Sequence, residues 1–330
     1  MSETNISSAQ RAQNFSAATR RNYHTLPSRT VNQLGETVQF NYPKARLLSK
    51  TMVKFECTFA EDVSTFINNT NTYPYEIIRR ISLSMNNGWE PFVISGRDLA
   101  LMNMISVNPN VYIPSNKNLV QYEGKKLTFM LELENTLNQR DCSGLIILQN
   151  EATQCVLSID LATNYGATLE SCKITPTLVT YTVPNYKEAF PDISVIKLVK
   201  ARTEKLLKGG EHILKLDIGT IYRKLAFYFT DDEGNGIEPV SGNIEIIYNT
   251  ADTPISIDID TLKMMNTGDF GENLPKGYYV FDFSGYKGFS EYAGSRDFID
   301  TSRLTEFWVR FTTKDNCNVT TIQENLSRLR

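Results

Sequence analysis

The chain has 330 residues, of which 41% are hydrophobic and 22% charged, and these proportions are ordinary for a folded protein of roughly two domains. A formal net charge of −3 gives no general attraction to nucleic acid or to anionic lipid. No apolar run reaches the roughly 18 residues that a membrane-spanning helix needs, and the N-terminus lacks the apolar stretch of a secretory signal.

Residues 1–34 differ in composition from everything after them. They are rich in Ser, Ala, Gln and Asn, and four arginines face a single acid. A serine cap at Ser7 or Ser8 predicts a helix that runs to about Asn22. The segment is either a frayed tail or a basic arm that orders against a neighbour or an anionic surface. The arginines that would make such contacts are Arg11, Arg20 and Arg21.

From Gly35 to Pro184 the pattern is that of β-strands, because apolar residues alternate with polar ones between turn signals. Strands are predicted at 38–42, 47–59, 75–85, 127–133, 145–148, 156–161 and 174–183. Asn86-Asn87-Gly88 is a hairpin signal. Gly96–Ile105 is predicted to form a short helix, since helix formers and apolar spacing coincide there.

The second half repeats this plan. Strands are predicted at 213–218, 221–229, 244–248, 255–259, 279–283 and 307–312, with a short helix at 260–266. Four features of the two halves correspond. They are Gly35-Glu36 with Gly210-Glu211, Leu99–Asn103 with Leu262–Asn266, 127–133 with 279–283, and 174–183 with 307–312.

Two all-β domains of this size fit the jelly-roll architecture. We therefore predict an arm or helix at 1–34, a first jelly roll at 35–186, and a second jelly roll with a C-terminal tail at 187–330.

Residue patterns for chemistry are mostly absent. Neither His24 nor His212 belongs to a zinc or catalytic motif, and Gly234-Asn235-Gly236 is predicted to be a turn. The acidic pairs Glu132/Glu134 and Asp258/Asp260 could serve a glycosidase, but alternation with apolar residues favours the solvated face of a half-buried strand. Five cysteines without a Cys-x-x-Cys pair argue against a metal knuckle and a disulfide scaffold. We predict buried free thiols at Cys57, Cys142, Cys155, Cys172 and Cys317, and no catalytic, cofactor-binding or metal-binding residue.

The loop at 284–294 carries three aromatic residues, Tyr286, Phe289 and Tyr292. They could form a platform for a carbohydrate or partner, or hold the loop against its own domain. We favour a third interpretation, packing between subunits, because Tyr and Phe are enriched in buried interface centres.

Several segments resemble a known family. In the C-terminal half they are Phe281-Asp282-Phe283-Ser284, Ser295–Asp300 and Leu304–Phe307, and near the N-terminus they are Gln10–Ala12, Arg20–Tyr23 and Phe40–Ala45. Together they resemble the double jelly-roll major capsid proteins of tailless icosahedral phages with an internal membrane, the tectivirus-like group.

This resemblance implies an all-β fold of two consecutive eight-stranded jelly rolls, with a short N-terminal helix and short helices in loops. It also implies a non-enzymatic homotrimer that forms pseudo-hexagonal capsomers in an icosahedral shell, without a cofactor. The implied partners are neighbouring capsomers, penton and minor capsid proteins, and the internal membrane through the N-terminal arm, with no direct nucleic-acid contact. The protein would be made in the bacterial host cytoplasm and reside in the virion. The alternative is a two-domain β-sandwich that binds glycans or recognises a host.

Overall fold

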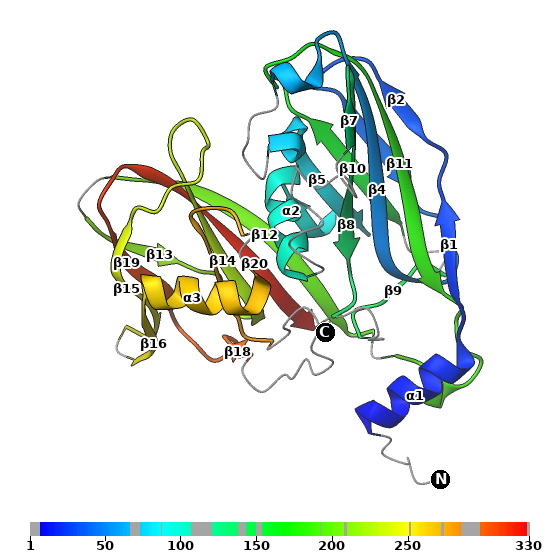
Figure 1. Ribbon diagram of the computed structural model, residues 1–330. Helices are drawn as coiled ribbons and strands as arrows, with labels where there is room; N and C mark the ends of the chain where they lie inside the picture. The colour runs from blue at the N-terminus through cyan, green and yellow to red at the C-terminus, as the bar shows by residue number, and fades with distance from the viewer. Residues whose placement is uncertain are drawn as a thin grey trace.

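The computed structural model describes residues 7–66, 73–86, 88–106, 121–137, 143–149, 154–191, 193–207, 210–250, 252–271, 274–284 and 298–328. Two β-sheet lobes lie side by side, and each has one helix on its flank, α2 (Gly96–Ser106) in the first and α3 (Ile259–Phe270) in the second (Figure 1). A further helix, α1 (Ser8–Ala18), projects below the first lobe. Within the described ranges, no helix has the length and apolar character needed to cross a membrane.

The first lobe is a sandwich of antiparallel sheets. Its strands are β1 (Arg21–Thr25), β2 (Arg29–Val31), β3 (Thr37–Asn41), β4 (Leu47–Phe59), β5 (Ile78–Met85), β6 (Trp89–Ile94), β7 (Gln121–Glu123), β8 (Lys126–Glu134), β9 (Ile146–Ile147), β10 (Cys155–Leu161) and β11 (Leu169–Tyr181). One sheet has the order β1-β11-β4-β8-β7, with β2 beside β11 and β9 beside β4, and the other has the order β3-β10-β5-β6. Their side chains meet in one core that includes Phe55 of β4 and Ile81 of β5.

The second lobe has the same architecture. Its strands are β12 (Val195–Leu206), β13 (Glu211–Lys215), β14 (Ile221–Thr230), β15 (Val240–Tyr248), β16 (Asp252–Asp258), β17 (Tyr278–Asp282), β18 (Ile299–Asp300), β19 (Phe307–Thr313) and β20 (Cys317–Arg328). One sheet runs β12-β20-β14-β17 with β18 beside β14, and the other runs β13-β19-β15-β16. Short 3₁₀ helices, η1 (Val63–Thr65), η2 (Tyr73–Ile77) and η4 (Lys187–Ala189), lie in connections of the first lobe and between the lobes.

A single sheet passes through both lobes. The edge strand β6 of the first lobe pairs in parallel with the edge strand β12 of the second, where Val199 lies opposite Phe92 and Lys200 opposite Val93. The strands β3-β10-β5-β6 and β12-β20-β14-β17 therefore form one continuous sheet. This continuity fixes how the two lobes meet.

The strand orders show an internal repeat. β1, β3, β4, β5, β6, β8, β9, β10 and β11 correspond in place to β12, β13, β14, β15, β16, β17, β18, β19 and β20, and α2 corresponds to α3. Three of the predicted correspondences are confirmed. The fourth is wrong, because the counterpart of β11 is β20 and not the strand at 307–312, which is β19.

Two further predictions are corrected by the strands. The segment predicted to be a C-terminal tail contains β20, which lies between β12 and β14. The N-terminal helix ends at Ala18 and not near Asn22, because the chain becomes extended at Thr19 and Arg21–Thr25 pairs with β11. The division at residues 34 and 186 stays a prediction, although β1 occupies the same place in its sheet as β12.

Other local predictions are confirmed. β5 and β6 are joined by the predicted hairpin at 86–88, where Asn86 and Gly88 have positive φ, and α2 covers the predicted helix at 96–105.

Candidate functional site

Each flanking helix binds the backbone of a later strand, β8 for α2 and β17 for α3, through one asparagine. Asn103 of α2 donates from Nδ2 to the carbonyl of Glu132 at 2.9 Å, and its Oδ1 accepts from the amide of Glu132 at 3.0 Å. Asn266 of α3 makes the same two bonds with Val280, both at 2.8 Å. The side chains satisfy strand edges that no neighbouring strand covers at these residues, which would otherwise leave buried polar groups unpaired. Asn103 and Asn266 thereby fix the residue-by-residue equivalence of the two jelly rolls.

A β-bulge occurs at the same place in both jelly rolls. The register shifts at Ser49 in β4 and at Arg223 in β14, one residue before Lys50 and Lys224 respectively. A bulge places two consecutive side chains toward one face of the sheet. In β14 it directs Arg223 and Lys224 together toward the first jelly roll, where Lys224 Nζ donates to Ser106 Oγ of α2 at 3.2 Å.

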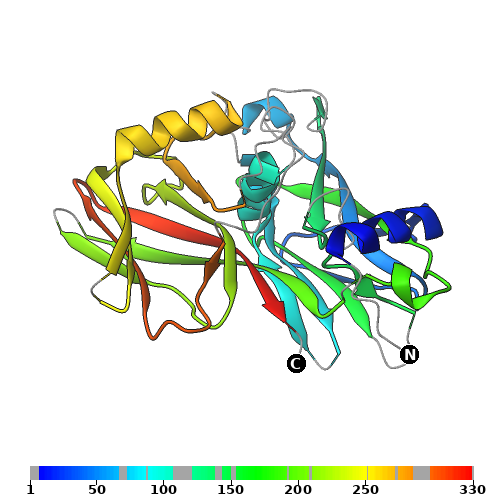
Figure 2. The same cartoon turned by 90° about the horizontal axis from the view of Figure 1, so that it is seen from below.

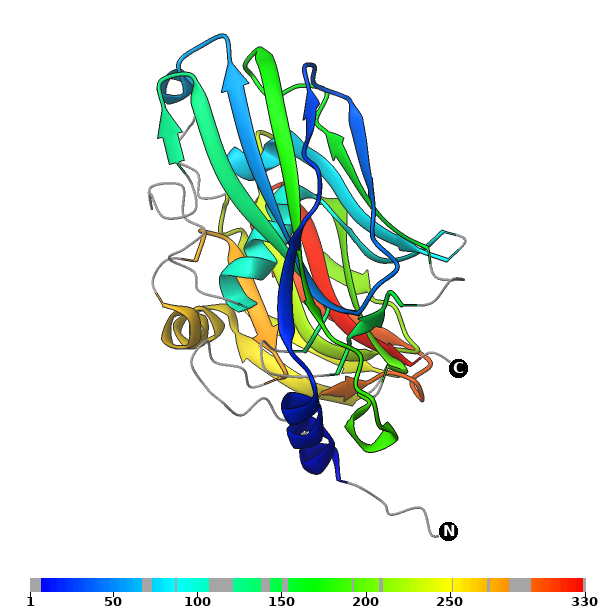
Figure 3. The same ribbon diagram turned by 90° about the vertical axis from the view of Figure 1, so that its right-hand side faces the viewer.

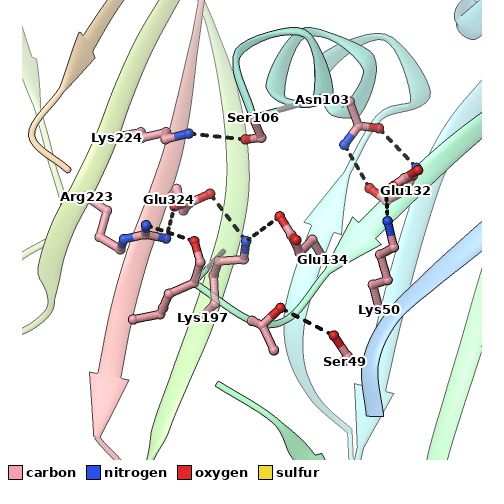
Figure 4. Close-up of polar contacts among 12 residues, drawn as sticks. Ser49, Lys50, Asn103, Ser106, Glu132, Glu134, Lys197, Arg223, Lys224 and Glu324 are labelled. Carbon is pink, nitrogen blue, oxygen red and sulfur yellow. Dashed lines mark hydrogen bonds and ion pairs between the residues drawn. The ribbon is translucent and has the colours of Figure 1, made fainter. Parts of the chain in front are cut away.

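Arg223 belongs to a buried ionic cluster at the junction of the jelly rolls (Figure 4). Its Nη1 lies 2.5 Å from Glu324 Oε1, and its Nη2 donates to the carbonyl of Leu137 at 3.0 Å. Lys197 Nζ lies 3.5 Å from Glu324 Oε2 and 4.0 Å from Glu134 Oε2. The cluster therefore combines β12, β14 and β20 of the second jelly roll with β8 of the first.

Electrostatics in this cluster keep Glu324 ionised. Burial opposes ionisation of the carboxyl, but Lys197, Arg223 and Lys224 outweigh it and lower the pKa of Glu324 to about 2. Burial lowers the pKa of Lys197, while Glu324 and Glu134 act in the opposite direction. A cavity of about 20 Å³ adjoins Lys197 and Glu324, and this is enough for one water molecule.

The interpretation of Glu132 and Glu134 as a solvated strand face is wrong. Glu132 is 8% exposed and pairs with Lys50 at 2.6 Å, and Glu134 pairs with Lys197 across the junction. Both carboxylates are neutralised by lysines, so they show the pairing of structural ions rather than an acid pair free to act on a sugar.

The second acidic pair does not lie on one strand face. Asp258 caps α3, where its carboxylate accepts from the backbone amides of Asp260 and Thr261. This is the usual role of an aspartate at a helix N-terminus.

The N-terminal arm is attached to the first jelly roll. Ser7 and Gln10 form a capping box at the start of α1, and Phe15 is buried against Leu47 and Leu145. The ring of Phe15 meets that of Tyr181 edge-on at 5.3 Å. The frayed-tail alternative is therefore wrong for the described part of the arm.

The three arginines of the arm lie outside the core. Arg11 is half-buried on α1, and Arg20 and Arg21 are exposed. The backbone of Arg20 exchanges hydrogen bonds with Thr182, and the guanidinium of Arg21 lies 6.0 Å from the ring centres of Tyr23 and Tyr181. Arg21 begins β1, so it belongs to the sheet and not to the helix.

The remaining candidates have structural surroundings. His212 Nε2 lies 3.0 Å from the Leu207 carbonyl and from Thr313 Oγ1. In the predicted turn at 231–236, the carboxylate of Asp231 accepts hydrogen bonds from the backbone amides of Glu233 and Asn235. The thiols of Cys57, Cys155, Cys172 and Cys317 are free and buried, as predicted.

Part of the prediction lies outside the described residues, namely Cys142 and the aromatic loop residues Tyr286, Phe289 and Tyr292. Among the residues that are described, no group of three or more His, Cys, Asp or Glu side chains could hold a metal ion.

No protein-family model and no curated protein sequence matches the chain. Solved structures match almost all of it. The STIV MCP covers 94% of this chain and 97% of its own at 14% identity, with a TM-score of 0.71. The match to the PBCV-1 virus capsid covers 93% of this chain and 94% of the capsid chain at 12% identity, with a TM-score of 0.68. The match to the major capsid protein P2 from bacteriophage PM2 covers 94% of this chain and 98% of P2 at 10% identity, with a TM-score of 0.61.

The structure thus has the double jelly-roll fold, as the strand orders and these matches show together. The three solved structures named above are double jelly-roll major capsid proteins.

Proposed function

We propose that the chain is a viral major capsid protein, and that it assembles as a homotrimer into pseudo-hexagonal capsomers of an icosahedral shell around an internal membrane. The observation that carries the proposal is the match to solved capsid proteins, which covers 93–94% of the chain. The protein acts by assembly rather than by catalysis, because the buried carboxylates of the junction are paired with cations.

The arginines of the arm, of which Arg11 is half-buried and Arg20 exposed, support contact with an anionic surface. α1 projects beyond the strands of the first jelly roll (Figure 3), where Arg11 and Arg20 would lie against lipid head groups, whereas Arg21 begins β1. Each such cation near an anionic membrane contributes about 1 kcal/mol. Penton and minor capsid proteins are the further partners of such a shell, and the virion is the place of action after synthesis in the host cytoplasm.

Mass measurement in solution tests the central claim. Sedimentation of the purified full-length chain is expected to give three times the monomer mass of 37.5 kDa. A monomer at all concentrations would contradict the capsomer.

Membrane contact is tested separately by binding to vesicles of phosphatidylglycerol. The variant Arg11→Ala/Arg20→Ala is expected to bind these vesicles at least about tenfold more weakly, since two cations are lost. Its trimer should form as in the wild type. Equal binding to neutral and anionic vesicles would argue against the arm as a membrane contact. Lys205→Ala is the matched control, because Lys205 is also exposed but lies on β12 of the second lobe.

A further inference from the structure

The flanking helices of the two jelly rolls differ in how well they are covered. In α2, Leu101 and Met102 are 0% and 3% exposed, and the hydroxyl of Tyr278 from the second jelly roll donates to the Leu101 carbonyl at 3.3 Å. The equivalent residues of α3 are Met264 and Met265, which are 75% and 52% exposed. Thioether side chains at these levels of exposure are typical of a surface that a partner covers.

The equivalence rests on an ungapped match. Residues 91–106 align with 254–269, with Pro, Ile, Leu, Met and Asn at the same five places. Asn103 and Asn266 make the same backbone bonds, and the capping residues Ser95 and Asp258 also coincide.

The outer faces of the two equivalent sheets, β12-β20-β14-β17 and β1-β11-β4-β8, also differ in whether a helix covers them. α2 packs on the outer face of β12-β20-β14-β17, where Val199 is 3% exposed and Tyr228 is 2% exposed beneath the guanidinium of Arg97. The register makes Tyr23 of β1 and Lys54 of β4 the equivalents of Val199 and Tyr228. Tyr23 is 63% exposed and the Lys54 side chain 49%. The first jelly roll therefore has the same kind of face without its cover.

Charge at the two uncovered surfaces is complementary. On the flank of the second jelly roll, Asp260 is the equivalent of Arg97 and Asp282 the equivalent of Glu134. On the open face of the first, Arg21 is the equivalent of Lys197. Repeating the intrachain junction between two molecules would place Asp282 beside Arg21, as Glu134 lies beside Lys197. It would also place Asp260 near Lys54, where Arg97 lies over Tyr228.

The two surfaces lie on different lobes. The face with β1 and β4 is turned toward the viewer in Figure 3, whereas α3 runs along one side of the second lobe in Figure 2. One molecule cannot bring them together, because the junction already fixes how its lobes meet.

We propose that a second copy of this chain covers α3, and that it does so with the outer face of its first jelly roll. The flank surface (Asp260, Met264, Met265 and Asp282) of one copy packs on the open face (Arg21, Tyr23 and Lys54) of the next and repeats the intrachain junction. Such a head-to-tail contact closes into a ring when the repeated rotation completes a turn. The inference rests on the proposed capsomer and specifies which surfaces build it.

Charge reversal tests the pairing. Arg21→Glu and Asp282→Arg are each expected to weaken association of the full-length protein at least about tenfold in sedimentation velocity, because like charges then face each other. The double variant Arg21→Glu/Asp282→Arg is expected to recover association to within about threefold. Met264→Asp is expected to weaken association as well, and its monomer should fold normally because the residue is exposed. Lys205→Glu, on a strand end outside both surfaces, is the control and should associate like the wild type.

The outcomes separate this inference from the function on which it rests. A monomeric wild-type protein would overturn both. An oligomeric wild type whose association is unchanged by Met264→Asp and by both charge reversals would overturn the surfaces and leave the capsomer in place. Weakening by both single reversals without recovery in the double variant would overturn the Arg21–Asp282 pairing. Circular dichroism and thermal melting of each variant distinguish loss of association from loss of the fold.

Discussion

The two jelly rolls have the same backbone irregularity but place different chemistry on it. In the first, the bulge residue is Ser49, whose hydroxyl lies 3.4 Å from that of Thr136. In the second it is Arg223, which pairs with Glu324 at 2.5 Å and is 2% exposed. The bulge is thus a feature of the repeated strand, while its side chain depends on what covers it. The charged version occurs where the sheet face meets the other jelly roll within the chain.

The asparagine of the flanking helix, unlike the bulge residue, is the same in both jelly rolls whatever covers it. Asn103 and Asn266 are both 5% exposed and make the same pair of bonds, although one helix is covered and the other is open. Closing a strand edge is needed in either setting, because an unsatisfied edge amide is costly in the interior and invites pairing at the surface.

The largest effect is expected from Glu324→Val, which gives β20 the residue found at the equivalent position of β11, Val179. The substitution leaves Lys197 and Arg223 buried without their shared carboxylate. Removing one partner from a buried ionic group costs about 3–5 kcal/mol. Chemical denaturation should show this loss in the free energy of unfolding.

The matched control is the triple variant Lys197→Met/Arg223→Met/Glu324→Val, which removes all three charges together. It is expected to recover most of the loss, since an apolar replacement of a whole buried cluster is often neutral or stabilising. If the triple variant were less stable than Glu324→Val, the cations would be shown to contribute through other contacts, such as that of Arg223 with the Leu137 carbonyl.

Acid should destabilise the junction through the same glutamate. The pKa of Glu324 is about 2 in the fold against an ordinary value of 4.5, so ionisation favours the folded state above pH 4.5. This stabilisation, about 3 kcal/mol, is lost as the pH falls from 4.5 toward 2. The variant Glu324→Gln should therefore show a smaller loss of unfolding free energy over this range than the wild type, and parallel curves for the two proteins would contradict the assignment.

A smaller and equal effect is expected for Asn103→Ala and Asn266→Ala. Each leaves one amide and one carbonyl unpaired, those of Glu132 in β8 or of Val280 in β17, which costs about 1–3 kcal/mol. The two sites belong to different jelly rolls, so the double variant should show the sum of the single losses. Unequal losses measured in the monomer would indicate that the junction, and not the strand edge, determines the cost.

Ser49→Ala should have the smallest effect. The Ser49–Thr136 hydrogen bond is long and joins two neutral hydroxyls, so its loss should lower the unfolding free energy by about 1 kcal/mol or less. Arg223→Ser at the equivalent bulge is the contrast and should cost several times as much, because it leaves Glu324 short of one cation. Similar values for the two variants would remove the distinction between the bulges.

Sequence patterns predicted the strands that face one core, because their apolar residues alternate. They missed β12 and β20, whose polar residues lie in the interior of the molecule. In β20, Val319 belongs to the core of the second jelly roll, whereas Ile322 contacts the first. Gln323, on a buried part of the same strand, accepts from the hydroxyl of Tyr222. A strand covered on both faces and paired through polar groups has neither alternation nor a continuous apolar run.

The ionic junction could not be predicted for the same physical reason. Glu132 and Glu134 alternate with leucines as they would on a solvated strand. Lys50 and Asn103 cover Glu132 within the first jelly roll, and Glu134 meets Lys197 of the second. The matched helices were predictable, because Leu99–Asn103 and Leu262–Asn266 correspond in sequence. The same correspondence makes Asn103 and Asn266 equivalent. Their bonds to β8 and β17 depend on the fold. The arm residues Arg11, Arg20 and Arg21 were placed by composition alone, which could not show that Arg21 starts a strand.

The central position of β20 has a consequence for biosynthesis. β20 pairs with β12 on one side and with β14 on the other, although these two strands precede it by about ninety residues or more. During translation the first jelly roll can close its own sheets, whereas β12 and β14 must wait for residues 317–328 before they share a neighbour. Until then both strands present unpaired edges on the ribosome-bound chain, where they can join a foreign strand. The polar side chains of β20 obscure its strand pattern in the sequence. They also keep this late segment soluble until it pairs with β12 and β14.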